Sequence, residues 1–206
     1  MAQSLKALRE EAKRCQACPL WANATQTVFG AGDPHARVML VGEQPGDEED
    51  RKGLPFVGPA GRLLDRALQA AGIEREGIYI TNAVKHFKWE QRGKRRLHKT
   101  PAQREIDACH RWLERELTAI RPEVVVALGA TAAKALFGPD FRVSVSRGKF
   151  VKSVHAPHAF ATFHPSALLR LRDEEEREAA FTQLAKDLAL ITKALRRASA
   201  APPARR

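Results

Sequence analysis

A basic segment that ends in a histidine is the part of this sequence best equipped for chemistry on a polyanion. It reads Gly93-Lys94-Arg95-Arg96-Leu97-His98, and possible metal ligands stand on both sides of it, His86 before and Cys109 after. Its cations could hold a DNA backbone while His98, at the tip of a loop, attacks a sugar, because a neutral imidazole is a competent nucleophile near pH 7. A solvated turn rich in lysine and arginine would look the same in isolation, so the rest of the chain has to decide.

The net charge favours a polyanionic partner. The 206 residues include 35 Lys and Arg against 24 Asp and Glu, a formal charge of +11. Such an excess indicates nucleic acid first and a membrane surface second. No apolar run approaches the roughly 20 residues that span a bilayer, and the N-terminal stretch reads as an amphipathic helix with acidic residues, unlike a signal peptide. We expect a cytoplasmic, nucleoid-associated protein without a membrane partner, and nothing in the sequence suggests more than a monomer.

Strands and helices are expected to alternate along the chain. The pattern predicts strands at residues 37–41, 77–81, 124–128 and 159–163, a hairpin-like pair near 142–145 and 149–154, and helices at 61–71, 101–120, 131–137 and about 173–197. Residues 124–128 are continuously apolar, which is typical of a strand buried on both faces of a parallel sheet. We therefore predict an α/β fold, a three-layer α/β/α sandwich with a central, mainly parallel four-stranded sheet, as one domain over residues 1–197. Residues 198–206 are expected to form a disordered basic tail.

Polar side chains follow the predicted strands at their carboxyl ends, which is where open parallel sheets bind ligands. They comprise Glu43, Gln44 and Asp47 after the first strand, Asn82 after the second, Thr131 after the third, and His164 and Ser166 after the fourth. Taken singly, each could be a solvated loop acid, a turn residue or a buried, hydrogen-bonded imidazole. Their shared position at one edge of the sheet predicts a functional site there.

Phe56 lies on a loop rich in glycine and proline, just before a predicted helix. Its simplest role is to anchor the core. An aromatic ring between two such breakers, close to the strand ends, could instead form a platform on which a nucleic-acid base stacks. Both interpretations remain open at this point.

The three cysteines could bind a metal. Cys15 and Cys18 form a CxxC pair, and Cys109 lies far downstream. An odd number of cysteines in a cytosolic protein argues against a disulfide framework. Three thiolates would leave one ligand position open, for which His86, His98 and His110 are candidates. Thiolate ligands suit zinc or an iron–sulfur cluster, and composition does not separate the two. Three unrelated buried thiols are the remaining possibility.

Together these motifs resemble those of the family-4 uracil-DNA glycosylases, and more closely their UdgX-type branch, over about residues 4–193. The matching segments are residues 42–46, 53–61, 81–85, 94–98 and 164–170. Gln44 stands where ordinary members carry alanine, which is a trait of the UdgX-type branch. Leu97 stands where isoleucine would be expected before the histidine, a conservative apolar change. The resemblance implies a uracil-DNA glycosylase-like fold and the excision of uracil from DNA, single-stranded DNA included.

The resemblance also implies roles for individual residues. Uracil would be bound by Gln44, Asp47, Phe56, Asn82 and His164. The DNA strand would be held by Lys94, Arg95, Arg96, Ser166 and Arg170. The catalytic residues would be His98, Glu43 and His164. In this scheme His164 supports the departing base, and Glu43 orients His98 or accepts its proton.

Two further features follow from the UdgX-type likeness. After uracil has left, His98 would capture C1′ of the abasic sugar, so that the enzyme acts once and stays attached to the DNA. Ordinary family-4 members hold a [4Fe–4S] cluster with four cysteines, and here the implied ligands are Cys15, Cys18, His86 and Cys109. One alternative is a turnover glycosylase in which water attacks and His98 only contacts phosphate. Another is a non-catalytic iron–sulfur module that binds DNA and releases no uracil.

Overall fold

A mainly parallel sheet forms the centre of the computed structural model, which describes residues 4–200. The strand order is β1-β3-β2-β6-β7. The parallel strands are β2 (Val38–Gly42), β3 (Ile78–Asn82), β6 (Val124–Leu128) and β7 (His158–Thr162). At one edge, the two-residue strand β1 (Ala31–Gly32) pairs antiparallel with β3. The predicted four-stranded sheet is confirmed, and β1 is a short addition to it.

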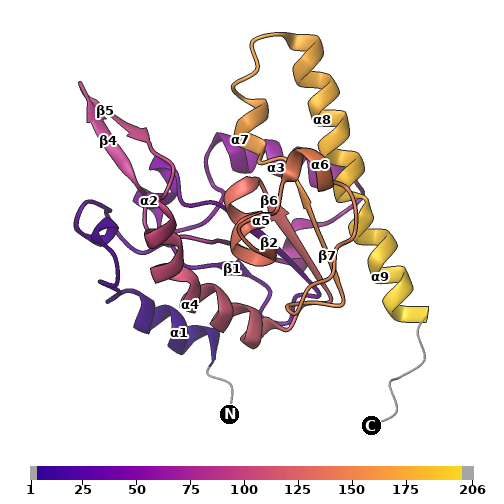
Figure 1. Ribbon diagram of the computed structural model, residues 1–206, viewed down its shortest axis with the longest axis horizontal. Coiled ribbons are helices and arrows are strands. Elements are labelled where there is room, and N and C mark those ends of the chain that lie inside the picture. The colour runs from indigo at the N-terminus through magenta and orange to yellow at the C-terminus, as the bar shows by residue number, and fades with distance from the viewer. Residues whose placement is uncertain (1–3, 201–206) are drawn as a thin grey trace.

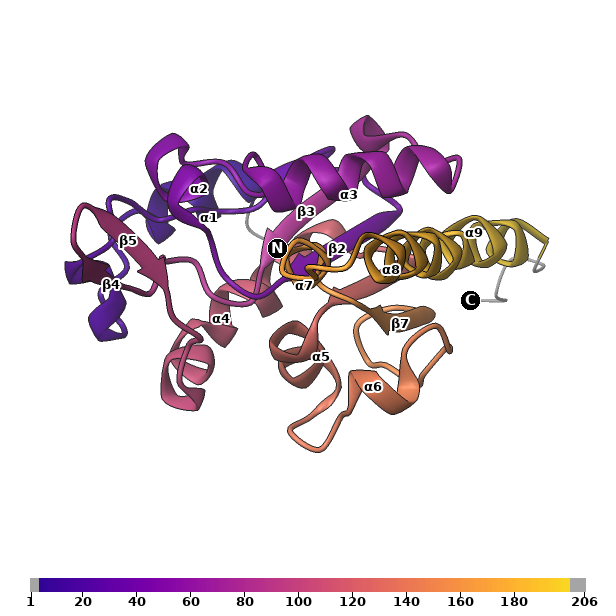
Figure 2. The same ribbon diagram turned by 90° about the horizontal axis from the view of Figure 1, so that it is seen from above.

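Helices cover both faces of the sheet (Figure 2). One layer holds α3 (Pro59–Ala70), α7 (Pro165–Leu168), α8 (Glu174–Leu188) and α9 (Leu190–Ala200). The other holds α4 (Gln103–Ile120), α5 (Ala130–Phe137) and α6 (Val143–Ser146). The N-terminal helix α1 (Leu5–Ala12) packs against α4, and the short helix α2 (Asp47–Lys52) follows β2. Two 3-10 turns, η1 (Pro19–Ala22) and η2 (Arg75–Gly77), complete the set within residues 4–200. The three-layer α/β/α architecture is confirmed.

Burial on both faces explains the apolar strands. Successive side chains of a strand point to opposite faces of the sheet. Accordingly, Val38 and Leu40 of β2 pack in the layer of α3 and α8, whereas Met39 and Val41 pack in the layer of α4 and α5. Every residue of β2, β3 and β6 is buried. A strand in this position has no solvent-facing side, so no polar alternation appears in its sequence.

The structure corrects two predictions about hairpins. Residues 143–146 form the single helical turn α6, and Val151 makes only an isolated bridge to Ala159, so the hairpin predicted near 142–154 is wrong. A hairpin does form at residues 89–98, where a loop was predicted. Its strands are β4 (Trp89–Arg92) and β5 (Arg95–His98), joined through Gly93 with a φ of 59°. His98 therefore lies at the base of a projecting hairpin and not at the tip of a loop (Figure 1).

The C-terminal region is helical as far as residue 200. Helix α9 continues through the first three positions of the predicted tail, 198–200, and the remaining positions, 201–206, lie outside the described residues. Between residues 4 and 200, no helix combines the length and apolar character that a bilayer crossing requires.

Candidate functional site

A cavity of about 190 Å³ opens at the carboxyl ends of the parallel strands. The predicted site residues that line it are Gln44, Phe56, Asn82, His98, His164, Ser166 and Arg170. An adjoining cavity of about 120 Å³ shares His98 and His164 with the first and adds Glu43. A larger, more open hollow of about 560 Å³ lies at the other end of the sheet, around residues 114–122 and 153–157, and contains none of the predicted site residues. The predicted site residues therefore gather around the two smaller, adjoining cavities.

Asn82 ends β3 with an acceptor that has no partner. Its side chain is 2% exposed, and within residues 4–200 its Oδ1 is the buried side-chain polar atom that makes no hydrogen bond. Leaving such an atom unpaired costs about 1–3 kcal/mol. Gly42 on the neighbouring strand makes the arrangement possible, because a Cβ there would lie 2.4 Å from Asn82 Oδ1 and 2.6 Å from the ring of Phe56. The site thus offers a ligand an unused acceptor, formed at the expense of stability.

A buried ion pair fixes the backbone that carries Asn82. Lys85 and Glu116 have fully buried side chains, with 2.5 Å between Nζ and Oε2. Lys85 also donates to the backbone oxygen of Asn82 at 2.7 Å and to the Thr81 hydroxyl at 2.6 Å. Glu116 in turn accepts hydrogen bonds from Tyr79 and Thr81. All three ammonium protons have partners, as a buried charge requires.

Phe56 is held by the loop between α2 and α3. Its φ of 55° lies in the left-handed region, which a residue with a side chain adopts only when its surroundings enforce it. Glu49 supplies that enforcement by accepting hydrogen bonds from the amides of residues 57 and 58, at 3.0 and 2.7 Å. Helix α3 also approaches closely, because a Cβ at Gly61 would lie 1.9 Å from the Phe56 carbonyl oxygen. The Phe56 ring centroid ends 5.7 Å from that of His164.

His164 is a neutral imidazole with its proton on Nε2. Its Nδ1 lies 3.1 Å from the amide nitrogen of Ser166 and 2.8 Å from that residue's hydroxyl. A backbone amide can only donate, so Nδ1 must accept and Nε2 must carry the proton. Burial, aided by His98 and by the positive field of Arg170, lowers the pKa of His164 to about 4. The residue therefore presents a neutral N–H donor to the cavity near pH 7.

His98 stands between a carboxylate and an amide. Its Nε2 lies 3.5 Å from Oε1 of Glu43 and 2.9 Å from Nε2 of Gln44. Burial lowers the pKa of His98 despite the nearby Glu43 carboxylate, which acts in the opposite direction. The Thr131 hydroxyl donates to the second oxygen of Glu43 at 2.5 Å and so orients the carboxylate. Because the Gln44 amide nitrogen can only donate, Nε2 of the neutral His98 carries a lone pair, as a nucleophile requires, and Glu43 acts on the ring through its negative charge.

Gln44 holds the base of the β4–β5 hairpin. Its Oε1 accepts from the Lys88 amide at 3.0 Å, and its Nε2 lies 3.2 Å from the Lys88 carbonyl oxygen and 3.0 Å from that of Lys99. Those two residues flank the hairpin, whose last strand ends at His98. Gln44 therefore lines the cavity, as predicted for a base-binding residue, and also links the hairpin to the end of β2.

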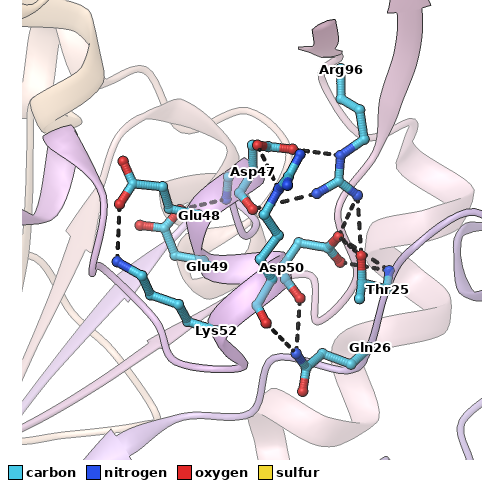
Figure 3. A network of polar contacts seen from close by, with 10 residues as sticks. Thr25, Gln26, Asp47, Glu48, Glu49, Asp50, Lys52 and Arg96 are labelled. Atoms are coloured by element: carbon cyan, nitrogen blue, oxygen red, sulfur yellow. Dashed lines mark hydrogen bonds and ion pairs between the residues drawn. The ribbon is translucent and has the colours of Figure 1, made fainter. Parts of the chain in front are cut away.

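Arg96 and Asp47 form an ion pair with each other (Figure 3), and neither residue lines the cavity. The guanidinium of Arg96 is 2.5 Å from the Asp47 carboxylate and 2.7 Å from that of Asp50, and its side chain is 13% exposed. Asp50 also accepts from the amide and the hydroxyl of Thr25. Through these hydrogen bonds and ion pairs, β5 is connected to α2 and to the N-terminal segment. The prediction that Asp47 binds the base and Arg96 binds phosphate does not fit this placement.

Two aromatic rings complete the enclosure of Arg96. Its guanidinium lies 5.4 Å from the ring centroid of Phe87 and 5.3 Å from that of Trp89. A cation packed between two rings and two carboxylates is already desolvated and neutralised. The cations that the hairpin leaves exposed are Arg92, Lys94 and Arg95, of which the last two were predicted to contact DNA. Ser166 and Arg170, the other predicted DNA contacts, lie together at the cavity, with 3.4 Å between hydroxyl and guanidinium.

The predicted metal ligands gather between α1, the end of β3 and α4. Cys15 and Cys109 are buried in one apolar cluster, against which Cys18 packs. The Trp112 indole donates to the Cys15 sulfur at 3.1 Å, and the Lys85 amide donates to the Cys109 sulfur at 3.2 Å. Burial raises the pKa of Cys109 to about 12. A thiolate in this place needs a compensating positive charge beyond its N–H donors.

The spacing of these ligands bears on which metal group they suit. His86, next to Lys85, is also buried. Within residues 4–200, no three His, Cys, Asp or Glu side chains are close enough together to hold one metal ion. A zinc site would place its ligands at about 2.0–2.3 Å from a single ion. A cluster binds each ligand to a different iron atom and so accommodates wider spacing. The soft thiolate and imidazole donors fit such a cluster.

Sequence reasoning missed several residues that shape the site. Glu49, Lys85 and Glu116 were not singled out, although each organises a predicted ligand-binding residue. Only Glu49 had a usable signal, since a Glu at the third helical position after Gly46 is a capping pattern. Lys85 and Glu116 are 31 positions apart, and no local pattern links them.

Comparison with known proteins identifies several relatives. The family model described as the uracil DNA glycosylase superfamily matches residues 29–189. A type-4 uracil-DNA glycosylase from Thermotoga maritima is 40% identical over 191 residues, which cover 92% of this chain and 95% of the relative. The type-4 enzyme of Archaeoglobus fulgidus is 38% identical over 84% of this chain and 89% of its own length. A type-5 uracil-DNA glycosylase from Thermus thermophilus is 34% identical over 72% of this chain and 71% of its own.

Proposed function

The chain belongs to the uracil-DNA glycosylase superfamily, and on that premise we propose that it excises uracil from DNA and then captures the abasic sugar on His98. The observation that carries the first part is the unpaired, buried Oδ1 of Asn82, a residue that lines the cavity. The second part is supported by a neutral His98 between Glu43 and Gln44. Each part has its own readout.

Uracil is recognised through the hydrogen-bonding edge of Asn82. Oδ1 accepts the N3–H of uracil and the side-chain amide donates to O4, while Phe56 stacks on the ring. Cytosine carries no proton on N3 and has an amino group at position 4, so both contacts would fail. A buried polar group left unpaired in this way discriminates strongly between substrates. Because a duplex encloses the base, the nucleotide must be flipped out or already single-stranded.

His164 assists the departure of the base. When the bond between uracil N1 and C1′ breaks, the electron pair stays with uracil, and negative charge develops on O2. The Nε2–H of His164 is a neutral donor whose tautomer is fixed by Ser166. A preorganised donor aimed at developing charge is usually the largest electrostatic contribution to such a reaction.

His98 then forms the new bond. A ring-nitrogen lone pair attacks C1′ of the oxocarbenium-like sugar, and the resulting imidazolium releases its remaining proton to solvent. Oε1 of Glu43, 3.5 Å from the His98 ring, stabilises the positive charge that passes from sugar to imidazole. The enzyme thereby becomes attached to the strand it has acted on. A water molecule in the adjoining cavity beside Glu43 and His98 is the competing nucleophile, and it would give a turnover enzyme instead.

The DNA strand is bound by the cations near the cavity mouth. Lys94 and Arg95 on the hairpin, with Ser166 and Arg170 at the cavity, contact the flanking phosphates. Such contacts position the substrate without reading its sequence. The net charge of +11 leads us to propose a nucleoid-associated, cytoplasmic monomer that accepts single-stranded as well as duplex DNA.

We also propose a [4Fe–4S] cluster, held by Cys15, Cys18, His86 and Cys109. The buried thiols and their N–H donors support it. When bound, the cluster supplies a rigid cross-link and no catalytic chemistry. It would join the N-terminal segment to the end of β3 and to α4, and so stabilise the strand that carries Asn82.

One experiment tests both parts of the proposal. The protein is incubated with a single-stranded oligonucleotide that contains one uracil, with a thymine-containing oligonucleotide of the same sequence as the control. We expect free uracil and a heat-stable protein–DNA band on a denaturing gel. Free uracil without the band would establish water as the nucleophile and overturn covalent capture. Binding without free uracil would overturn excision itself.

A further inference from the structure

The hydroxyl of Thr27 connects a backbone carbonyl to a side chain at the proposed cluster site. Its hydroxyl oxygen lies 3.0 Å from the carbonyl oxygen of Ala12 and 2.9 Å from Nε2 of His86. The Ala12 carbonyl also accepts a hydrogen bond from the amide of Cys15, at 3.0 Å. A short chain of hydrogen bonds thus runs from the backbone of one proposed ligand to the side chain of another.

The direction of these hydrogen bonds follows from counting protons. A threonine hydroxyl has one proton, and a carbonyl oxygen can only accept. If Thr27 donated to His86, the oxygens of Thr27 and Ala12 would face each other at 3.0 Å with no proton between them. If Thr27 donates to Ala12, its lone pair accepts from His86, and every one of these groups is satisfied. The second arrangement places the histidine proton on Nε2.

The remaining nitrogen of His86 is then a free lone pair. Among the described residues no hydrogen bond reaches Nδ1, and because Nδ1 is not one of the fully enclosed polar atoms without a partner, it must border open space. A histidine that binds a metal through one ring nitrogen almost always donates its other N–H to a protein acceptor. We propose that Thr27 is a positioning residue for the cluster, which fixes the tautomer and ring orientation of His86 so that Nδ1 binds iron. This inference rests on the proposed cluster and adds the binding atom and the residue that selects it.

Removal of this hydrogen bond has a defined consequence. Without an acceptor at Thr27, the His86 ring could rotate about its side-chain bonds, and either nitrogen could carry the proton. Replacing the hydrogen-bonding partner of a metal-bound histidine typically lowers metal affinity about 10–100-fold. The Cys15 end of the chain would keep its own hydrogen bond to Ala12, so the fold of the N-terminal segment should persist.

The binding atom can be measured in the unaltered protein. Full-length protein is produced with histidine labelled with ¹⁵N at Nδ1 alone, and a second sample is labelled at Nε2 alone. Pulsed electron paramagnetic resonance of the reduced cluster then reports which label is strongly coupled to iron. We expect strong coupling from the Nδ1 label and weak coupling from the Nε2 label. Strong coupling from Nε2 would overturn the proposal.

Two variants test the role of Thr27. Thr27→Val keeps the shape and removes the hydroxyl, whereas Thr27→Ser keeps the hydroxyl. We expect Thr27→Val to lose iron to a chelator at least about 10-fold faster than the unaltered protein, and Thr27→Ser to behave like the latter. Equal iron retention in Thr27→Val and the unaltered protein would overturn the proposal. If Thr27→Val failed to fold, the labelled unaltered protein would still decide the binding atom.

The outcomes also separate this inference from the cluster proposal. Two results would refute the role of Thr27 and leave the cluster proposal standing. They are strong coupling of the cluster to the Nε2 label, and a rate of iron loss that is the same in Thr27→Val and the unaltered protein. Stoichiometric zinc, or iron without any coupled histidine nitrogen, would refute the proposed ligand set and the Thr27 inference together. Free uracil measured on the same preparations reports excision separately, so its failure is not confused with either result.

Discussion

One carboxylate oxygen of Glu43 lies 3.5 Å from Nε2 of His98, and the other accepts a hydrogen bond from the Thr131 hydroxyl. The two oxygens of one side chain thus have separate partners, a fixed donor and the imidazole. Glu43 follows β2, Thr131 lies in α5, and His98 ends the hairpin, so three segments distant in sequence form this arrangement. Because Thr131 fixes the Glu43 carboxylate, the negative charge of Glu43 acts on His98 from a defined direction. A short hydrogen bond between Glu43 and His98 is not needed for this effect.

Asn82→Ala should separate stability from function. The change removes an unpaired, buried acceptor, so the free protein is expected to lose little stability or to gain up to about 1 kcal/mol. Uracil excision should fall below detection, while affinity for DNA without uracil stays nearly constant, since phosphate contacts supply most of it. Thermal unfolding, a uracil-release assay and binding to an undamaged oligonucleotide measure the three effects. An equal loss of affinity for undamaged DNA would contradict the role of Asn82.

Arg95 and Arg96, neighbours in sequence, should behave differently. Arg95→Ala should weaken binding to all DNA sequences and reduce the slope of log affinity against log salt concentration by about one unit for each phosphate that the variant no longer binds. Arg96→Ala should leave that slope nearly unchanged, because its guanidinium is paired with Asp47 and Asp50. It should instead slow adduct formation, since the hairpin that carries His98 would no longer be attached to α2. A salt titration of both variants distinguishes the two roles, and equal slopes would contradict the distinction.

The contrast between these two arginines shows what can be predicted from the sequence. The carboxyl-end rule for parallel sheets placed Gln44, Asn82 and His164 correctly at one cavity, because it depends only on strand direction. It could not place Arg96, whose partner Asp47 is 49 positions away. The charge pattern at residues 93–98 is the same whether an arginine faces solvent or a buried carboxylate.

The hairpin itself was missed for a related reason. The strands β4 and β5 are largely exposed and rich in charge, so they lack the apolar alternation that marks a strand with one buried face. Their position depends on tertiary contacts, namely Gln44 at the base and the carboxylates of α2 along one side. Conversely, the valines near residues 143–145 suggested a strand, yet packing of Val143 against the core is satisfied by one helical turn.

Lys85→Met should destabilise the protein strongly. The substitution leaves Glu116 charged and buried without its partner, and breaking a buried pair in this way typically costs about 3–5 kcal/mol. Adding Glu116→Gln should recover part of the loss, because it removes the unpaired charge and keeps an acceptor for Tyr79 and Thr81. Chemical denaturation of the single and double variants measures both values. A double variant less stable than Lys85→Met alone would contradict this explanation.

The stability of the protein should fall in acid partly because of His164. Its pKa is lowered to about 4 in the folded state, against an ordinary value of 6.5, so the unfolded chain binds more protons between these values. Stability is therefore highest above pH 6.5 and decreases as the pH falls towards 4, by at most about 3 kcal/mol for this group. In His164→Gln that contribution should disappear. We therefore compare the unfolding free energies of the two proteins at about pH 7 and at about pH 4.5. The value for the unaltered protein minus the value for His164→Gln should be lower at the acidic pH, and a constant difference would refute the assignment.

His98→Ser provides the most direct test of covalent capture. The change removes the proposed nucleophile and leaves Asn82, Phe56 and His164 in place to bind uracil and support its departure. The vacated volume adjoins the cavity beside Glu43, where water can approach the sugar. We expect the heat-stable adduct to disappear while free uracil is released over many turnovers, leaving an alkali-labile abasic site.

Two measurements make that result specific to His98. Peptide mapping of the unaltered protein should place the sugar on His98, whereas an adduct on Lys94 or Lys99 that borohydride traps would indicate Schiff-base chemistry and refute the assignment. Arg95→Ala serves as the matched control on the same strand, because it weakens DNA binding but leaves the imidazole next to Glu43. It should form less adduct at low protein concentration and gain no turnover. If Arg95→Ala also turned over, release from DNA would limit the reaction, and the single-turnover behaviour would not depend on His98.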